Sequence, residues 1–165
     1  GVSKAYAMTG WRIGYAAGDK DLIKAMNKVQ SQSTSSACSI SQYAAIEAIS
    51  GPQDKVFEMR DEFEKRRNKV VDFLNDIDGI NCLTPDGAFY VYPNCSGLIG
   101  KKTAEGKIIE NDNELSQYLL KKEGVAVVPG EAFGLSPHFR ISYAASMDSL
   151  IDACDRIKKA CDKLI

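Results

Sequence analysis

The sequence of 165 residues has one histidine and no cysteine pair in C-x-x-C spacing, so it lacks the usual ligand sets of a zinc site. It also lacks an apolar run near the ~20 residues that a membrane-spanning helix needs. Neither sign of charge dominates, because 21 basic and 22 acidic side chains leave a formal net charge of -1. We therefore expect no metal site, no membrane segment and no nucleic-acid partner.

The remaining composition is that of an ordinary globular protein, with 44% apolar and 26% charged residues. Its five cysteines are odd in number and widely spaced, which is typical of reduced thiols in a cytoplasmic protein. The sequence begins at Gly1 without a methionine, and we expect it to be the C-terminal part of a longer protein.

Hydrophobic periodicity predicts helices and short strands that alternate along the chain. The pattern favours an α/β class, with a small α+β domain in which helices cover a small sheet. We expect residues 1–45 to end a larger domain and connect it onward, and residues 46–165 to form the small domain. Helices are predicted over 20–29, 40–49, 54–76, 114–123 and from 147 onward, strands over 11–17, 80–83, 88–92, 125–128 and 139–144, and a mobile excursion over 94–113.

Three cationic residues are candidates for chemistry, and each has a structural alternative. Lys4 lies among small residues before a turn, where it is either a surface charge or an amine that can attack an aldehyde. Arg12, in the predicted strand 11–17, needs either a carboxylate of the same protein or a phosphate. Arg140, in the strand 139–144, fits either an internal ion pair or a bound carboxylate.

Two further features lie near Arg140 in the sequence. His138 is titratable, but its position at the entry of a strand favours a surface histidine. Gly130 and Gly134 flank Phe133 in a loop that either approaches a ligand closely or is only a turn.

Four segments in this order resemble the class I pyridoxal-phosphate-dependent aminotransferases, and within them the aspartate aminotransferase branch. They are GVSKAYAMTGWRIGY at 1–15, PDGAFY at 85–90, GVAVVPGEAFG at 124–134 and RISYA at 140–144. The resemblance covers essentially the whole chain and implies the fold type I of pyridoxal-phosphate-dependent transferases. It also implies pyridoxal 5'-phosphate as cofactor and a homodimer as the full-length protein.

The resemblance also implies roles for individual residues. Lys4 matches the lysine that forms a Schiff base with the cofactor and later moves a proton on the substrate. Arg12 matches the arginine that holds the cofactor phosphate. Arg140 matches the arginine that binds the substrate α-carboxylate, with Phe133 close to that pocket.

Two positions depart from the family pattern. Gly1 stands where some members have a serine that binds the phosphate, and residues 30–39 lack the arginine with which others read a side-chain carboxylate. Several other family site residues precede the lysine, so we expect this part alone to be inactive.

The implied activity is transfer of an amino group between L-aspartate, or a related amino acid, and 2-oxoglutarate. The alternatives are an aminotransferase of aromatic amino acids, prephenate or alanine, and a non-catalytic α/β interaction or sensing module.

Overall fold

The computed structural model describes the whole chain, Gly1–Ile165, as two compact units, Gly1–Arg60 and Asp61–Ile165. The domain boundary predicted after residue 45 concerns the longer protein and stays a prediction. No helix combines the length and the apolar character needed to cross a membrane.

The first unit contains two helices, and each begins where the sequence predicts. In α1 (Lys20–Ser33), the Asp19 carboxylate caps the helix by accepting the backbone N–H groups of Asp21 and Leu22. The second helix, α2 (Ser39–Ser50), ends at Gly51, which is followed by a proline. None of the α1 side chains is buried, although Leu22, Met26 and Val29 form an apolar stripe.

The strand predicted over 11–17 is wrong. A short 3-10 helix, η1 (Thr9–Trp11), occupies its start, and the residues that follow up to α1 are irregular. A strand needs a hydrogen-bonded neighbour, and the chain provides none there.

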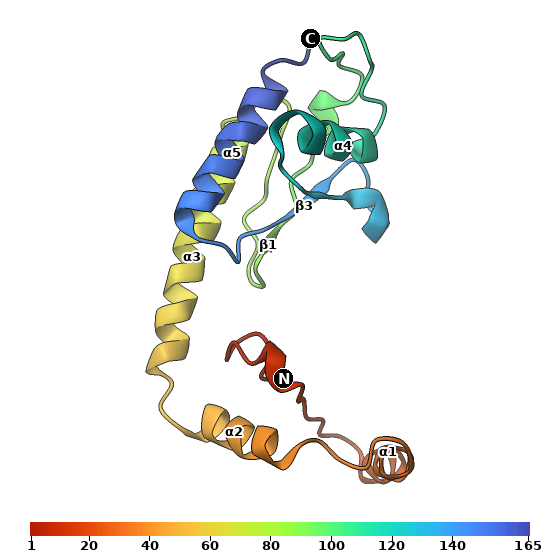
Figure 1. The fold of residues 1–165 in the computed structure, drawn as a ribbon, viewed down its shortest axis with the longest axis vertical. Helices are drawn as coiled ribbons and strands as arrows, with labels where there is room; N and C mark the ends of the chain where they lie inside the picture. The colour runs from red at the N-terminus through yellow and green to blue at the C-terminus, as the bar shows by residue number, and fades with distance from the viewer. The chain divides into compact units, whose positions relative to one another are not determined.

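The long helix α3 (Asp54–Asn75; Figure 1) agrees with the predicted 54–76 and runs from the first unit into the second. Its exposed side carries charged pairs, of which Glu62 and Arg66 are 3.1 Å apart. In its last two turns Val70, Val71 and Leu74 are buried.

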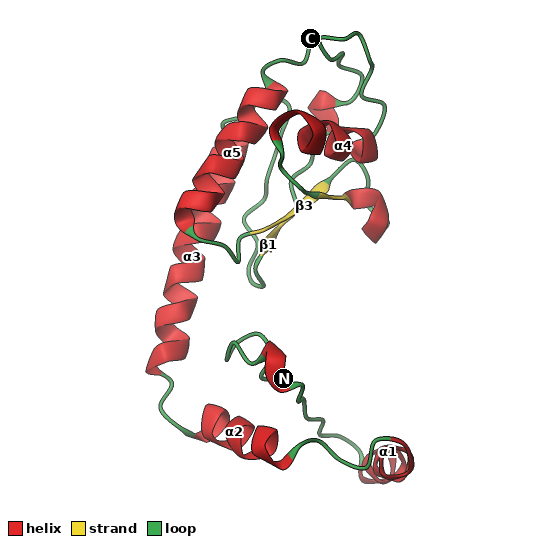
Figure 2. Cartoon of the chain, viewed as in Figure 1, coloured by secondary structure: helices red, strands yellow, loops and turns green.

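The second unit is built on a three-stranded antiparallel sheet with the order β1-β3-β2. Figure 2 shows β1 and β3 beside one another. The strands are β1 (Tyr90–Val91), β2 (Val128–Pro129) and the central β3 (Phe139–Ser142). In the register, Tyr90 pairs with Ser142 and Val128 pairs with Arg140. Because side chains alternate along a strand, Arg140 and Ser142 share one face of β3, and Phe139 lies on the other.

Two helices complete this unit. Asn111 caps α4 (Asp112–Glu123), which ends at Gly124 in the left-handed conformation, and Ser146 caps α5 (Met147–Cys161). One hydrophobic core joins α3, α4, α5 and the inner face of the sheet. Its largest fully buried side chains are Tyr143, Phe139, Leu74, Ile77, Leu98, Ile109, Leu115, Leu119 and Ile157.

Three predictions for the second unit need correction. Residues 80–83 form only an isolated bridge between Asn81 and Asn94, and β2 and β3 are shorter than predicted. The segment 94–113 is not a loose excursion, because Leu98 and Ile109 are fully buried within it. The Gly100 N–H also donates to the Ile109 carbonyl at 2.8 Å.

All five cysteines are free thiols. Cys38 is exposed just before α2, whereas the other four are buried in the second unit: Cys82, Cys95, Cys154 and Cys161.

Candidate active site

The segment that carries Lys4 and Arg12 is attached to α2 by a small apolar cluster. Val2 and Met8 are buried against Ala45 of α2. Two hydrogen bonds add to this packing. The Ser41 hydroxyl donates to the Trp11 carbonyl at 2.8 Å, and the Tyr6 hydroxyl donates to the Gln53 side-chain oxygen at 3.1 Å.

The same segment leaves Lys4 and Arg12 exposed. A turn closes at Lys4, whose carbonyl accepts the Ala7 N–H at 3.1 Å. Ala7 and Arg12 have positive φ angles of 53° and 51°, a left-handed conformation that costs a non-glycine residue about 1–2 kcal/mol. Strain of this kind gathers at functional sites.

Arg12 is neither in a strand nor in an ion pair with a carboxylate, and the phosphate expected as its other partner stays a prediction. Its Nη1 donates to the Thr9 carbonyl at 2.8 Å, which folds the side chain back over η1. A guanidinium has five N–H donors, and this bond leaves others for an anion.

Arg140 is half-buried on the outer face of β3, and no carboxylate of the chain lies within 4.0 Å of it. The internal ion pair considered from the sequence is therefore absent. Instead, its guanidinium carbon lies 4.3 Å from the centre of the Tyr90 ring and 4.4 Å from that of the Phe133 ring. Phe133 ends the 3-10 helix η3 (Gly130–Phe133), which follows β2.

His138 is half-buried rather than a surface histidine. Its ring stacks on Tyr92 at 5.2 Å, and its Nδ1 atom is buried without a hydrogen-bond partner. Burial raises the pKa of the Tyr92 hydroxyl, and the negative charge of Asp112 raises it further, while Arg140 lowers it. His138 is therefore packed against Tyr92 and is not an exposed surface residue.

Gly130 has a structural reason to be glycine. A Cβ atom there would lie 2.1 Å from the Leu135 carbonyl oxygen and 2.9 Å from the Tyr92 hydroxyl. Of the two readings of this loop, close packing of the backbone accounts for Gly130 without a ligand.

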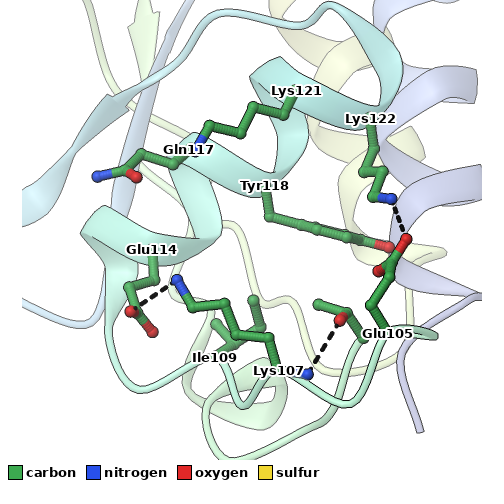
Figure 3. Close-up of a pocket in the computed structure, with 9 residues that line it drawn as sticks. Glu105, Lys107, Ile109, Glu114, Gln117, Tyr118, Lys121 and Lys122 are labelled. Atoms are coloured by element: carbon green, nitrogen blue, oxygen red, sulfur yellow. Dashed lines mark hydrogen bonds and ion pairs between the residues drawn. The ribbon is translucent and has the colours of Figure 1, made fainter.

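A separate hollow of about 200 Å³ lies between α4 and the loop before it. Its lysines are neutralised in part by neighbours, as Figure 3 shows for Lys107 with Glu114 and Lys122 with Glu105. None of the predicted site residues lines this hollow.

Residues 1–157 match the family described as aminotransferase class I and II. The chain belongs to this aminotransferase family. It is 60% identical over 161 residues, which is 98% of the chain, to a probable aspartate/prephenate aminotransferase of Rhizobium leguminosarum bv. phaseoli. It also matches a crystal structure of the aspartate aminotransferase from Rhizobium meliloti, with a TM-score of 0.98 and 57% identity over 100% of the chain. A structure of an aromatic aminotransferase from Pyrococcus horikoshii OT3 matches at a TM-score of 0.86 and 35% identity over 98% of the chain.

The chain spans about 40% of the length of these relatives: 40% of the first, and 41% of each of the two structures. The predicted family and the α/β fold class are thereby confirmed.

The predicted site residues lie in both units, Lys4 and Arg12 in the first, Arg140 and Phe133 in the second. Phe133 was predicted from the sequence, but Tyr90, the second ring on Arg140, was not. The signal was present, because Tyr90 lies in the matched segment PDGAFY, but only the strand register shows that it faces Arg140.

Proposed function

We propose that this chain forms part of an aminotransferase that moves an amino group between L-aspartate, or a related amino acid, and 2-oxoglutarate, with pyridoxal 5'-phosphate as cofactor. The observation that carries the proposal is the strained, anchored segment that exposes Lys4 and Arg12 together. We further propose that the full-length protein is a cytoplasmic homodimer, as the family resemblance and the free thiols suggest.

The donor set fits the cofactor by its chemistry. The cofactor supplies an aldehyde that condenses with amines and a ring that withdraws electrons from the bonds of the attached carbon. Lys4 offers a primary amine for the aldehyde, and Arg12 offers a fixed cation with spare donors for the phosphate. The buried contacts of Val2 and Met8 with α2 hold the segment that carries both groups.

In the proposed reaction Lys4 has two tasks. Its Nζ atom would hold the cofactor by its aldehyde group. As a free amine, Lys4 would then accept the proton from the substrate α-carbon and later give it up again. Arg140 binds the substrate α-carboxylate through parallel N–H donors, which fixes the α-carbon for this transfer.

Aromatic or prephenate substrates are a second candidate, favoured by the absence of an arginine in residues 30–39. Ratios of kcat/KM for aspartate, prephenate, phenylalanine and alanine on the full-length protein would separate these activities. A higher kcat/KM for aspartate supports the proposal. A higher kcat/KM for prephenate or phenylalanine would mean that the second candidate is the substrate.

The decisive experiment is the substitution Lys4→Ala in the full-length protein. The visible absorbance band of the lysine-bound cofactor should disappear, and kcat/KM should fall at least about 100-fold, because the proton-transfer base is lost. Lys20→Ala, an exposed lysine at the start of α1, is the matched control and should keep both. An unchanged absorbance band in Lys4→Ala would refute the proposal and favour a non-catalytic module.

A further inference from the structure

The surroundings of Arg140 are unusual for a half-buried cation, because aromatic rings take the place of a carboxylate. Its guanidinium carbon lies 4.3 Å from the Tyr90 ring centre and 4.4 Å from the Phe133 ring centre. A guanidinium that stacks on an aromatic face is held by the electrostatic attraction of the ring. Its N–H groups point outward in the guanidinium plane and do not bond to the ring, so they remain available for a ligand.

The sheet register places Tyr90 at Arg140. Tyr90 pairs with Ser142 across β1 and β3, and Ser142 lies two residues after Arg140 on the same face. Tyr90 and Arg140 are therefore diagonal neighbours, a spacing that aromatic and long side chains bridge. The neighbours Val91 and Phe139 point to the opposite face, where both are fully buried and fix the two strands.

Phe133 reaches Arg140 from a loop that is fastened on two sides. The Tyr92 hydroxyl lies 3.1 Å from the Gly130 carbonyl and 3.3 Å from the Leu135 carbonyl, which bracket the loop. Buried Asp112 accepts the backbone N–H of Glu131 at 3.2 Å through Oδ2. The Phe133 ring also meets the Tyr92 ring edge-on, with ring centres 6.2 Å apart.

We infer that Tyr90 and Phe133 are positioning residues that hold the plane of the Arg140 guanidinium. Its paired N–H donors are thereby oriented for a carboxylate before the ligand binds. The inference rests on the proposed carboxylate-binding role of Arg140. An arginine without such support loses rotamer freedom when the ligand binds, which costs about 0.5–1.5 kcal/mol, whereas a held one has lost it already. Removal of one ring should thus weaken carboxylate binding about 2- to 12-fold.

The test is calorimetric binding of 2-oxoglutarate to the full-length protein loaded with pyridoxal phosphate. 2-Oxoglutarate has no amine, so it binds this form without turnover. Tyr90→Leu should raise the Kd about 2- to 12-fold, while Tyr90→Phe, which keeps the ring and loses only the hydroxyl, should bind like the parent. In steady-state assays, KM for the amino-acid substrate should rise with little change in kcat, because the residues positioned are not those that move the proton.

Arg140→Ala separates failure of this inference from failure of the proposed function. It should weaken binding at least about 100-fold, because two charge-assisted hydrogen bonds are lost. Unchanged binding by Arg140→Ala would overturn the carboxylate role itself. A large loss in Arg140→Ala with parent-like binding by Tyr90→Leu would overturn the positioning role alone. If Tyr90→Leu does not fold, Phe133→Leu gives the same test, because Phe133 is half exposed and lies outside the core.

Discussion

The two units of this chain use apolar residues in opposite ways. The second unit buries a continuous core that joins three helices and a sheet, whereas the buried cluster of the first unit contains only Val2, Met8 and Ala45. The large apolar side chains of the first unit are mostly exposed: Trp11, Tyr15, Leu22, Met26, Val29, Ile40, Tyr43, Ile46, Ile49 and Phe57. The periodicity of α1 predicts where a helix lies, but burial of its apolar stripe needs a second surface to pack against.

The largest expected difference between the units is in the cost of truncating a leucine. Leu74 is fully buried, so Leu74→Ala should lower the free energy of unfolding by about 2–5 kcal/mol. Leu22, which is 58% exposed on α1, is the matched control, and Leu22→Ala should change the free energy of unfolding by less than about 0.5 kcal/mol. Denaturant unfolding of the chain measures both. Equal costs would mean that the first unit has a core comparable to that of the second.

Thiol reactivity should divide the units next. Burial raises the pKa of Cys95 and Cys161 to about 12 and that of Cys82 and Cys154 to about 11. Backbone hydrogen bonds from Ser41 and Ile40 at the start of α2 lower the pKa of Cys38.

A disulfide reagent at neutral pH should thus modify one thiol of the native chain quickly and the other four at least about 100-fold more slowly, because the thiolate is the reactive form. Cys38→Ser should abolish the fast phase, and denaturant should expose the remaining four thiols together. Two or more fast thiols in the native chain would contradict the burial of the second unit.

The smallest expected effect concerns an electrostatic link between α4 and α5. Lys159 and Lys163 each bond to the Glu123 carboxylate at 2.8 Å and lower its pKa to about 2. Because the pKa of Glu123 is lower in the folded chain than in the unfolded chain, its ion pairs stabilise the fold fully above the unfolded pKa of about 4.3. This stabilisation is lost as the pH falls through about 2.

Glu123→Gln should therefore lower the melting temperature at pH 7 and make no difference near pH 2. Glu58→Gln, which removes the exposed ion pair of Glu58 with Lys55, is the control and should lower the melting temperature at pH 7 by less. A difference between Glu123→Gln and the parent that persists unchanged at pH 2 would show that the effect is not electrostatic.

The sequence predicted best what depends on neighbouring residues. The Asp19 and Ser146 caps and the extent of α3 follow from local spacing, because helices are closed by bonds within a few residues. The strand expected over 11–17 failed because a strand is stabilised by a distant partner, and spacing along the chain does not show whether one exists.

The candidate site shows the same division. Lys4 and Arg12 could be proposed from a contiguous motif, and their roles stay predictions. Phe133 was expected near Arg140 from the resemblance, whereas the place of Tyr90 could not be foreseen, because it lies 50 residues earlier and reaches Arg140 only through the register of β1 and β3.

The alternation of β3 also limits how this strand can change. Phe139 points into the core and Arg140 points away from it, so the two neighbours cannot exchange environments without loss. An insertion or deletion of a single residue before this strand would turn every side chain over, placing a guanidinium in hydrocarbon and a phenyl ring in water. We expect this strand to accept point substitutions on its open face far more readily than any change in its length.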